Sequence, residues 1–282
     1  MADLETRELE HFVAVAEELH FGRAALRLSI AQPALSRTIR GIEARLGVQL
    51  LIRTSRYASL TPAGEALLRS GRHALNAVRA AAESARRAGD ADAQLRLVIK
   101  SGGAANVLSG ILGAYSREPD ARQVEILFGG HVDSVDYLRD GRADVALLYV
   151  PFDDLTGLEY DVLYSEGRIA ILPPDHRLAT RTELQLADLA DEPMPRWKGV
   201  PNGGNGPEIE DLAQLVQMVR LGRTLSTLPP SLLEPVPPGV ICIPVTDAPT
   251  SQLVLAWSPL NPSPLIASFV AAATAAVGAG VR

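Results

Sequence analysis

The 282-residue chain has little cysteine and no clustering of glycine or proline, and each scarcity excludes a class of protein. Cys242 is the sole cysteine, which excludes a disulfide framework and a thiolate metal cage and suits a reducing cytosol. The 20 prolines and 23 glycines are spread along the chain, so collagen-like and low-complexity classes are excluded. Residues 1–5 are acidic and lack the basic and apolar regions of a signal peptide, so we expect a cytoplasmic protein.

A long, strongly apolar run is also missing. Residues 258–281 carry no charge, but Pro259, Pro262 and Pro264 interrupt their first part. The rest is mostly alanine with larger side chains at helical spacing, whereas a membrane span needs about 20 strongly apolar residues. We therefore expect a C-terminal helix that docks on the protein, and no membrane partner.

Charge is distributed unevenly along a chain whose net charge is −6. Residues 20–72 hold nine arginines against only two acidic residues, Glu43 and Glu65. Arginine is the usual basic residue of this protein, because Lys100 and Lys198 are its only lysines, but that preference does not explain why acids avoid one segment. A locally basic segment on an acidic chain indicates a polyanionic partner at one end.

Apolar residues near the start of the chain recur at helical spacing. A helix over about residues 9–19, a short helix over 23–28 and a third helix from Gln32-Pro33 to a stop at Gly47 are predicted, since proline is tolerated in a first turn. This order is typical of helix-turn-helix DNA binders, whose last helix enters the major groove. There Gln and Ser bond base edges, and Arg pairs with guanine or phosphate. The polar and basic face of the third helix consists of Gln32, Pro33, Ser36, Arg37 and Arg40.

The next segments predict a wing and a long helix. Two short extended runs within residues 48–60 indicate a β-hairpin that carries Arg53 and Arg56 toward DNA. Thr61-Pro62 begins another helix, in which small and apolar residues alternate spacings of three and four, as in a coiled-coil seam that suits dimerisation. A helix packed on its own domain remains the alternative. The predicted seam residues include Leu68, Leu75, Val78 and Ala82.

Five segments in this region together resemble one known family. They are Phe12–Glu18, Phe21–Ala25, Gln32–Arg37, Ile42–Gly47 and Leu60–Gly64, and they occur in register. The set closely resembles the winged helix-turn-helix of LysR-type transcriptional regulators.

The resemblance assigns roles to the residues of the third helix and the wing. It implies that Gln32, Pro33 and Ser36 face bases, that Arg37 and Arg40 mix phosphate and base contacts, and that Arg53 is the wing contact. The family usually has serine before Gln-Pro, whereas this chain has Ala31. A missing N-cap of this kind is worth about 1 kcal/mol, so either another group caps the helix or its first turn frays.

After residue 90 strand-like runs alternate with helices, which predicts an α/β fold with a parallel or mixed sheet covered on both faces. A second set of elements follows, with helices expected near 183–189 and over 208–221. LysR-type regulators carry a two-lobed effector domain like a periplasmic binding protein. The expected domains are the winged helix-turn-helix at 1–60, a linker and dimerisation helix with a hinge at 61–90, and the effector-binding domain at 91–282. Lobe one is expected at about 91–160 and 258–282 and lobe two at about 161–257, with crossings near Tyr160 and Ser258.

Open α/β sheets bind ligands at the C-terminal ends of their strands. Ser101 and Gly102 follow the first strand of the second domain and open a helix, whose backbone N–H groups suit an anion. Gly129 follows the next strand, and Trp197 and Thr224 lie near strand edges of lobe two. For these last three residues an ordinary turn or packing role is equally open.

These features predict a sequence-specific DNA-binding transcriptional regulator controlled by a small-molecule effector, for which an anion is one candidate. Its expected partners are a dyad-symmetric double-stranded operator and further copies of itself as a dimer or tetramer, and RNA polymerase is left open. No cofactor, metal or catalytic residue is expected, since a helix cap explains His131–Asp136 better than a metal site does. A solute-binding protein would fit residues 95–282 alone, and an enzyme would need an acid–base pair in the cleft that the sequence does not supply.

Overall fold

The computed structural model describes residues 4–53, 58–88, 94–100, 103–130, 134–198, 200 and 204–280. The chain divides into two compact units, residues 1–82 and residues 83–282, which are described separately below.

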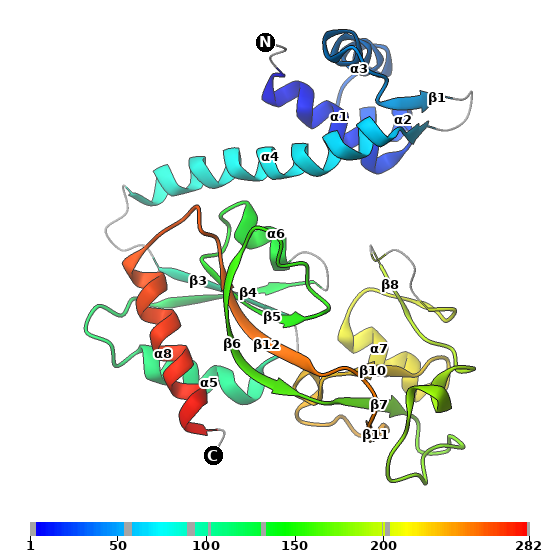
Figure 1. Ribbon diagram of the computed structural model, residues 1–282, viewed down its shortest axis with the longest axis vertical. Coiled ribbons are helices and arrows are strands. Elements are labelled where there is room, and N and C mark those ends of the chain that lie inside the picture. The colour runs from blue at the N-terminus through cyan, green and yellow to red at the C-terminus, as the bar shows by residue number, and fades with distance from the viewer. Residues whose placement is uncertain are drawn as a thin grey trace. The chain divides into compact units, whose positions relative to one another are not determined.

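The first unit consists of helices and a small hairpin (Figure 1). Helices α1 (Thr6–Glu18), α2 (Phe21–Arg27) and α3 (Gln32–Leu46) surround one core, in which Phe12, Leu35, Ile39 and Ile42 are fully buried. Strands β1 (Leu51–Arg53) and β2 (Ala58–Leu60) pair antiparallel and form the predicted wing. Helix α4 (Pro62–Ala88) follows, and its residues up to Ala82 belong to this unit.

The first lobe of the second unit contains a five-stranded mixed sheet, as expected. Its strand order is β4 (Val124–Gly129), β3 (Leu95–Lys100), β5 (Val145–Val150), β12 (Ser251–Trp257) and β6 (Glu159–Glu166). Strand β3 is parallel to β4 and β5, whereas β12 is antiparallel to β5 and β6. The C-terminal ends of β3, β4 and β5 therefore meet at one edge of the sheet.

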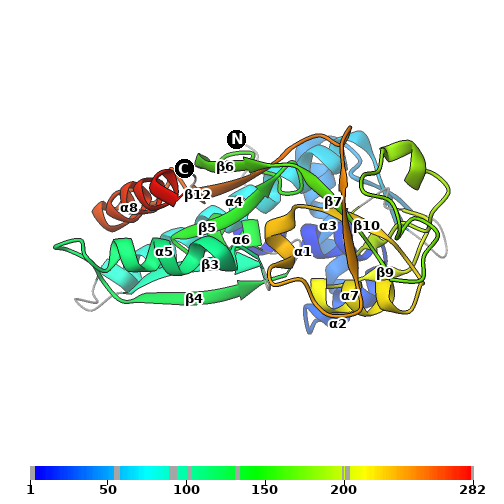
Figure 2. The ribbon, with the colours of Figure 1, turned by 90° about the horizontal axis from the view of Figure 1, so that it is seen from below.

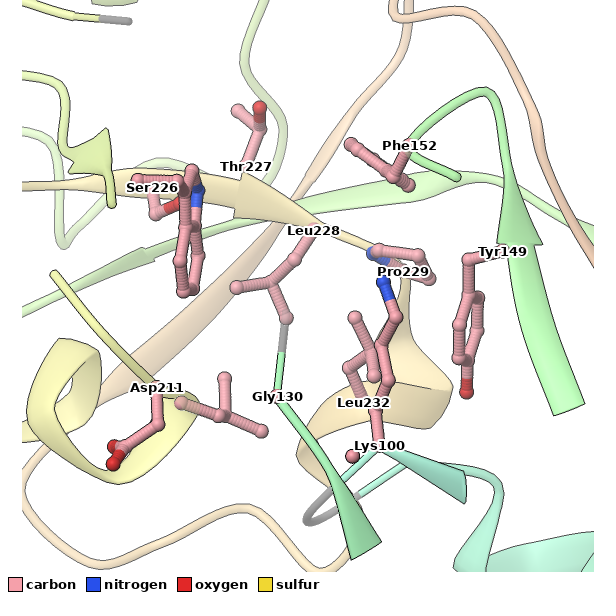
Figure 3. Close-up of a pocket in the computed structure, with 13 residues that line it drawn as sticks. Lys100, Gly130, Tyr149, Phe152, Asp211, Ser226, Thr227, Leu228, Pro229 and Leu232 are labelled. Atoms are coloured by element: carbon pink, nitrogen blue, oxygen red, sulfur yellow. The ribbon is translucent and has the colours of Figure 1, made fainter. Parts of the chain in front are cut away.

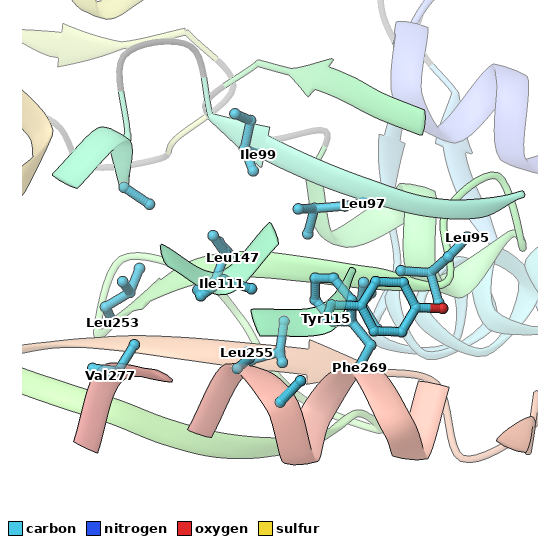
Figure 4. Packing of buried hydrophobic residues seen from close by; sticks show 14 of the residues in the cluster. Leu95, Leu97, Ile99, Ile111, Tyr115, Leu147, Leu253, Leu255, Phe269 and Val277 are labelled. Carbon is cyan, nitrogen blue, oxygen red and sulfur yellow. The ribbon is translucent and has the colours of Figure 1, made fainter. Parts of the chain in front are cut away.

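Helices cover both faces of this sheet, because side chains alternate along its buried strands. Helices α5 (Ala105–Tyr115) and α8 (Pro264–Gly280) lie side by side on one face, and α6 (Ser134–Arg139) packs on the other (Figure 2). The Tyr115 and Phe269 rings meet edge to face with their centroids 5.0 Å apart (Figure 4). Helix α8 is thus docked as expected, and none of the helices in the described ranges has the length and hydropathy needed to cross a bilayer.

The second lobe is built differently, on a three-stranded antiparallel sheet of order β10 (Ser226–Leu228), β7 (Arg168–Leu172) and β11 (Ile241–Val245). Helix α7 (Leu212–Arg220) and the short 3-10 helices η1 (Leu186–Leu189) and η2 (Pro230–Leu233) accompany it. Strands β8 (Arg196–Trp197) and β9 (Glu208–Ile209) form a separate parallel pair.

The crossings between the lobes differ from the expected positions near Tyr160 and Ser258. Strand β6 stays in the sheet of lobe one until Glu166, so the first crossing falls at Gly167, directly before β7. Strand β12 already belongs to that sheet at Ser251, so the return crossing falls at residues 246–250. Because β6 begins with polar residues, the sequence does not indicate a strand there. It is an edge strand, and its partner β12 lies far away in the sequence.

The helix expected over residues 208–221 begins later. Glu208 and Ile209 pair with β8 instead, and α7 starts at Leu212. Asp211 caps the helix, since its side chain accepts a hydrogen bond from the Gln214 N–H at 2.8 Å.

Candidate functional site

The outer face of α3 brings five predicted DNA-facing residues together. Leu35, Ile39 and Ile42 anchor the opposite face of the helix in the core, each fully buried. The side chains on the outer face line one shallow surface hollow: Gln32, Pro33, Ser36, Arg37 and Arg40. We call this set the reading surface.

The two ends of α3 match the sequence analysis. Ala31 stands at the N-cap in an extended conformation and provides no side-chain cap, while Pro33 occupies the first turn. Gly47 closes the helix in the left-handed region with φ = 69°. The preceding helix has a cap that we did not anticipate, because the His20 Nδ1 accepts hydrogen bonds from the N–H groups of Gly22 and Arg23.

Several arginines away from the reading surface are paired with carboxylates of α1. The Glu17 carboxylate forms ion pairs with the guanidinium groups of Arg27 at 2.7 Å and Arg72 at 2.8 Å. Burial alone would raise the pKa of Glu17, but hydrogen bonds from the two guanidinium groups outweigh it and hold the pKa below the ordinary value of 4.5. Arg37 and Arg40, by contrast, form no ion pair with any residue of the described part of the chain.

The wing is fastened to α3 through one carboxylate. The Glu43 Oε1 accepts hydrogen bonds from the backbone N–H groups of Leu50 at 3.0 Å and Leu51 at 3.2 Å. Strand β1 ends at Arg53, but the side chain of Arg53 and the whole of Arg56 lie outside the described residues. The predicted wing contacts therefore stay predictions.

Helix α4 corrects part of the predicted dimerisation seam. Leu75 is only 5% exposed and belongs to the core of the first unit, and Leu68 packs against the same core. A Cβ at Gly71 would lie 2.8 Å from Leu9 Cδ1, so α1 and α4 touch closely here. Leu75 is thus buried in its own domain and Leu68 is partly buried there, whereas Val78 and Ala82 are exposed.

The second unit has a pocket at the C-terminal ends of β3, β4 and β5, where its two lobes face each other (Figure 3). The empty space among its lining residues is about 690 Å³, which includes open solvent at the mouth. Lobe one contributes Lys100, Gly129, Gly130, Tyr149 and Phe152. The other lining residues are Trp197, Asp211, Leu212, Ser226, Thr227, Leu228, Pro229 and Leu232. We call this pocket the cleft.

Of the residues predicted for the cleft, the structure places two on its lining. Gly129 and Trp197 line it, although Gly129 also has a packing reason, because a Cβ there would lie 2.3 Å from Ser134 Oγ. The prediction of Thr224 is wrong: its side chain is fully buried and donates to the Pro193 carbonyl at 2.7 Å. Ser101 and Gly102 lie outside the described residues.

A buried ion pair lies at the base of the cleft. Lys100 closes β3 and is 7% exposed, and its Nζ lies 2.8 Å from Oδ1 of Asp153, which is 8% exposed. The other oxygen of Asp153 accepts the Tyr149 backbone N–H at 2.8 Å. Lys100 is not among the residues predicted for the cleft, although a charged residue that ends an apolar strand directly before Ser101 is a usable signal.

Hydroxyl groups connect the lobes beside the cleft. The Ala104 N–H donates to the Tyr149 hydroxyl at 3.1 Å, which lies 3.0 Å from Ser231 Oγ, and Ser231 Oγ donates to Glu166 Oε1 at 2.5 Å. Because Ser231 has one proton to give, the Tyr149 hydroxyl is the donor toward Ser231. Burial raises the pKa of Tyr149, so this bridge is made of uncharged hydroxyls and ends on one carboxylate.

The other motifs of the sequence contribute no site in the described part of the chain. No group of three or more histidine, cysteine or acidic side chains there could hold a metal ion, and His131 and Asp133 lie outside it. Cys242 is a half-buried free thiol in β11, and burial raises its pKa.

The chain thus combines a winged helix-turn-helix unit with a two-lobed α/β unit that has a cleft. Two family models match it: "Bacterial regulatory helix-turn-helix protein, lysR family" over residues 6–65 and "LysR substrate binding domain" over residues 88–278. The chain belongs to the LysR family of bacterial helix-turn-helix regulators. This is a family of transcriptional regulators, in agreement with the expectation that the chain is not an enzyme.

Individual relatives agree with this assignment. The Hca operon transcriptional activator HcaR of Escherichia coli is 31% identical over 287 residues, which cover 95% of this chain and 96% of HcaR. AlsR of Bacillus subtilis is 36% identical over 193 residues, 68% of this chain. The match spans 63% of AlsR and 64–65% of two further curated relatives of similar identity. The structure of full-length CbnR complexed with its target DNA has the same fold, with a TM-score of 0.52 at 22% identity over 97% of this chain and 100% of CbnR.

Proposed function

We propose that the chain is a sequence-specific DNA-binding regulator of transcription, and that a small molecule in the cleft controls it. The reading surface carries this proposal. Arg37 and Arg40 are exposed and have no carboxylate partner among the described residues, so both are available to phosphates and guanines. CbnR, which has the same fold, has been solved in complex with its target DNA, and that supports DNA binding by this chain.

The cleft supports the second part of the proposal. It lies between two lobes that are connected by two crossings, so a molecule held by both lobes would favour one arrangement of the lobes over another. An effector can shift the equilibrium only by its difference in affinity for the two arrangements. Regulation then consists of a change in how the paired reading surfaces meet the operator, and it takes place in the cytoplasm, where the DNA is.

Self-association fits an operator with dyad symmetry. Val78 is 52% exposed and Ala82 is exposed, and the two residues lie four positions apart, on one face of α4. We propose this face, without Leu68 and Leu75, as the part of α4 that a second copy contacts. A Val78→Arg variant should then shift the protein toward monomer in sedimentation velocity, whereas Arg79→Ala, at the next position, should not.

The test of DNA binding uses the full-length protein and a labelled duplex from the region upstream of its own gene. Fluorescence anisotropy should show tighter binding to this duplex than to a scrambled one, with an affinity that falls linearly on a log–log plot against salt. If the protein binds the two duplexes equally, its preferred sequence is sought by selection from a pool of random duplexes instead. A selection without an enriched dyad sequence contradicts sequence-specific binding, and absence of any binding at low salt contradicts the whole proposal.

A further inference from the structure

The charge at the base of the cleft is already balanced before any ligand arrives. Lys100 is the one cation among the described residues that line the cleft, and its ammonium is 2.8 Å from the Asp153 carboxylate. Asp153 is held from both sides, because its second oxygen accepts the Tyr149 N–H and its own N–H donates to the Tyr149 carbonyl at 2.9 Å.

The rest of the described lining adds no positive charge. Asp211 is a second carboxylate, at the N-cap position directly before α7. Phe152, Trp197 and Leu232 give the cleft aromatic and aliphatic walls. A ligand here therefore meets apolar surface, the hydroxyl side chains of Ser226 and Thr227, a neutral ion pair and one negative charge.

The Lys100 ammonium still has hydrogen bonds to give. It carries three N–H donors, and its ion-pair partner, Asp153 Oδ1, lies on one side of it at 2.8 Å. A ligand oxygen can accept another without disturbing the pair. If that oxygen belongs to a carboxylate, however, two anions share one cation in a site largely removed from water, and the excess charge is costly. An uncharged oxygen carries no such penalty.

We propose that the cleft selects a small, largely apolar molecule with an uncharged oxygen acceptor, such as an amide or a ketone, and that Lys100 donates to this oxygen while Asp153 disfavours carboxylates. This rests on the proposed function, in which the cleft is the effector site. It narrows the expectation from the sequence, which left an anionic effector as a candidate.

The first experiment compares ligands that differ only in charge. The full-length protein is titrated with benzamide and benzoate, and with cyclohexanecarboxamide and cyclohexanecarboxylate, by calorimetry. Each amide should bind at least about tenfold more tightly than its acid, a difference of roughly 1.4 kcal/mol. Equal or tighter binding of the carboxylates overturns the proposal. Absence of binding by all four compounds at about 10 mM, where fragments of this size bind a matching pocket, overturns it as well.

Variants then locate the selectivity. Asp153→Asn frees the Lys100 charge and should reverse the preference toward the acids, whereas Lys100→Met should weaken amide binding. The matched control is Asp154→Asn at the next position, whose side chain is 71% exposed and which does not line the cleft. It should keep the preference of the wild type. An unchanged preference in Asp153→Asn overturns the role of Asp153.

Operator binding by the same proteins separates this inference from the function beneath it. If the amides fail while the full-length protein binds its operator tightly and specifically, the ligand class is wrong and the regulator assignment stands. If operator binding also fails in the wild type, the proposed function itself is wrong. Circular dichroism of each variant establishes that it is folded, and the wild-type ligand comparison stands even where a variant does not fold.

Discussion

Positive charge is free on the reading surface and cancelled in the cleft. On α3 the guanidinium groups of Arg37 and Arg40 are exposed, with no ion pair to the residues that the structure describes. In the second unit Lys100 is buried against Asp153. A free surface charge attracts a polyanion over several ångströms and is sensitive to salt, whereas a buried, compensated charge offers directed hydrogen bonds and little long-range field. Affinity for DNA thus needs a positive charge without a partner in the protein, whereas selectivity for a small molecule needs a positive charge that is already paired.

The largest expected effect comes from placing a negative charge on the reading surface. Ser36→Glu should lower specific operator affinity by about 100-fold or more, because in the proposed complex the carboxylate would face base edges and phosphates. Ser70→Glu, on an exposed position of α4, should bind as the wild type does. Anisotropy with the operator duplex measures both. Wild-type affinity in Ser36→Glu would remove α3 from recognition.

The second effect comes from breaking the balance in the cleft. Lys100→Met leaves the Asp153 carboxylate buried without its cation and should lower the free energy of unfolding by about 3–5 kcal/mol. The double variant Lys100→Met/Asp153→Asn should recover most of the loss. Tryptophan fluorescence in urea reports on this unit alone, because Trp197 and Trp257 are the only two tryptophans and both lie in it. Equal losses in the single and double variants would contradict a compensated pair.

A smaller effect should distinguish free arginines from paired ones. Arg40→Ala should weaken binding about tenfold on all sequences alike and reduce the salt slope by about one, as expected for one lost phosphate contact. Arg27→Ala removes a guanidinium that Glu17 already engages and should change the slope little. The measurement is anisotropy at several salt concentrations. Equal salt slopes for the two variants would contradict the distinction between free and paired arginines.

The smallest effect concerns the paired arginines and acid. The pKa of Glu17 is lower in the folded protein than the ordinary 4.5, so its pairing contributes stability above that value. This stability is lost as pH falls through the folded pKa, at about pH 4.5 and below. Glu17→Gln should therefore flatten the acid side of a thermal melting profile, followed by circular dichroism, relative to the wild type. Glu10→Gln, an exposed neighbour, should leave the acid side unchanged.

Local signals predicted much of the first unit. Helix α3 begins at Gln32 and stops at Gly47, as its proline and glycine indicate, and the wing lies where two short extended runs were expected. These features depend on residues close in sequence, such as caps and helical spacing. The seam on α4 was harder to predict, because the same spacing suits a second copy or the core, and Leu75 packs into the core.

The second unit depends on distant partners, and there the sequence was less informative. The helix was predicted to begin at Glu208, but that residue pairs with β8. Asp211, three residues before Gln214, was a usable signal for the N-cap at which the helix begins. Thr224 was predicted for the cleft from its nearness to a strand edge, whereas the neighbouring Ser226 and Thr227 line it. The pair of Lys100 with Asp153 could not be predicted, since it joins the end of β3 to the turn after β5, 53 positions later.

The attachment of the wing to α3 has a consequence for how DNA would be met. Glu43 lies on α3, and its carboxylate accepts hydrogen bonds from two successive N–H groups at the start of β1. The distance between helix and hairpin is thereby set during folding. On binding DNA, α3 and the hairpin would dock as one rigid body. Binding would then not have to restrict their motion relative to each other, and this entropy cost would not weaken the affinity.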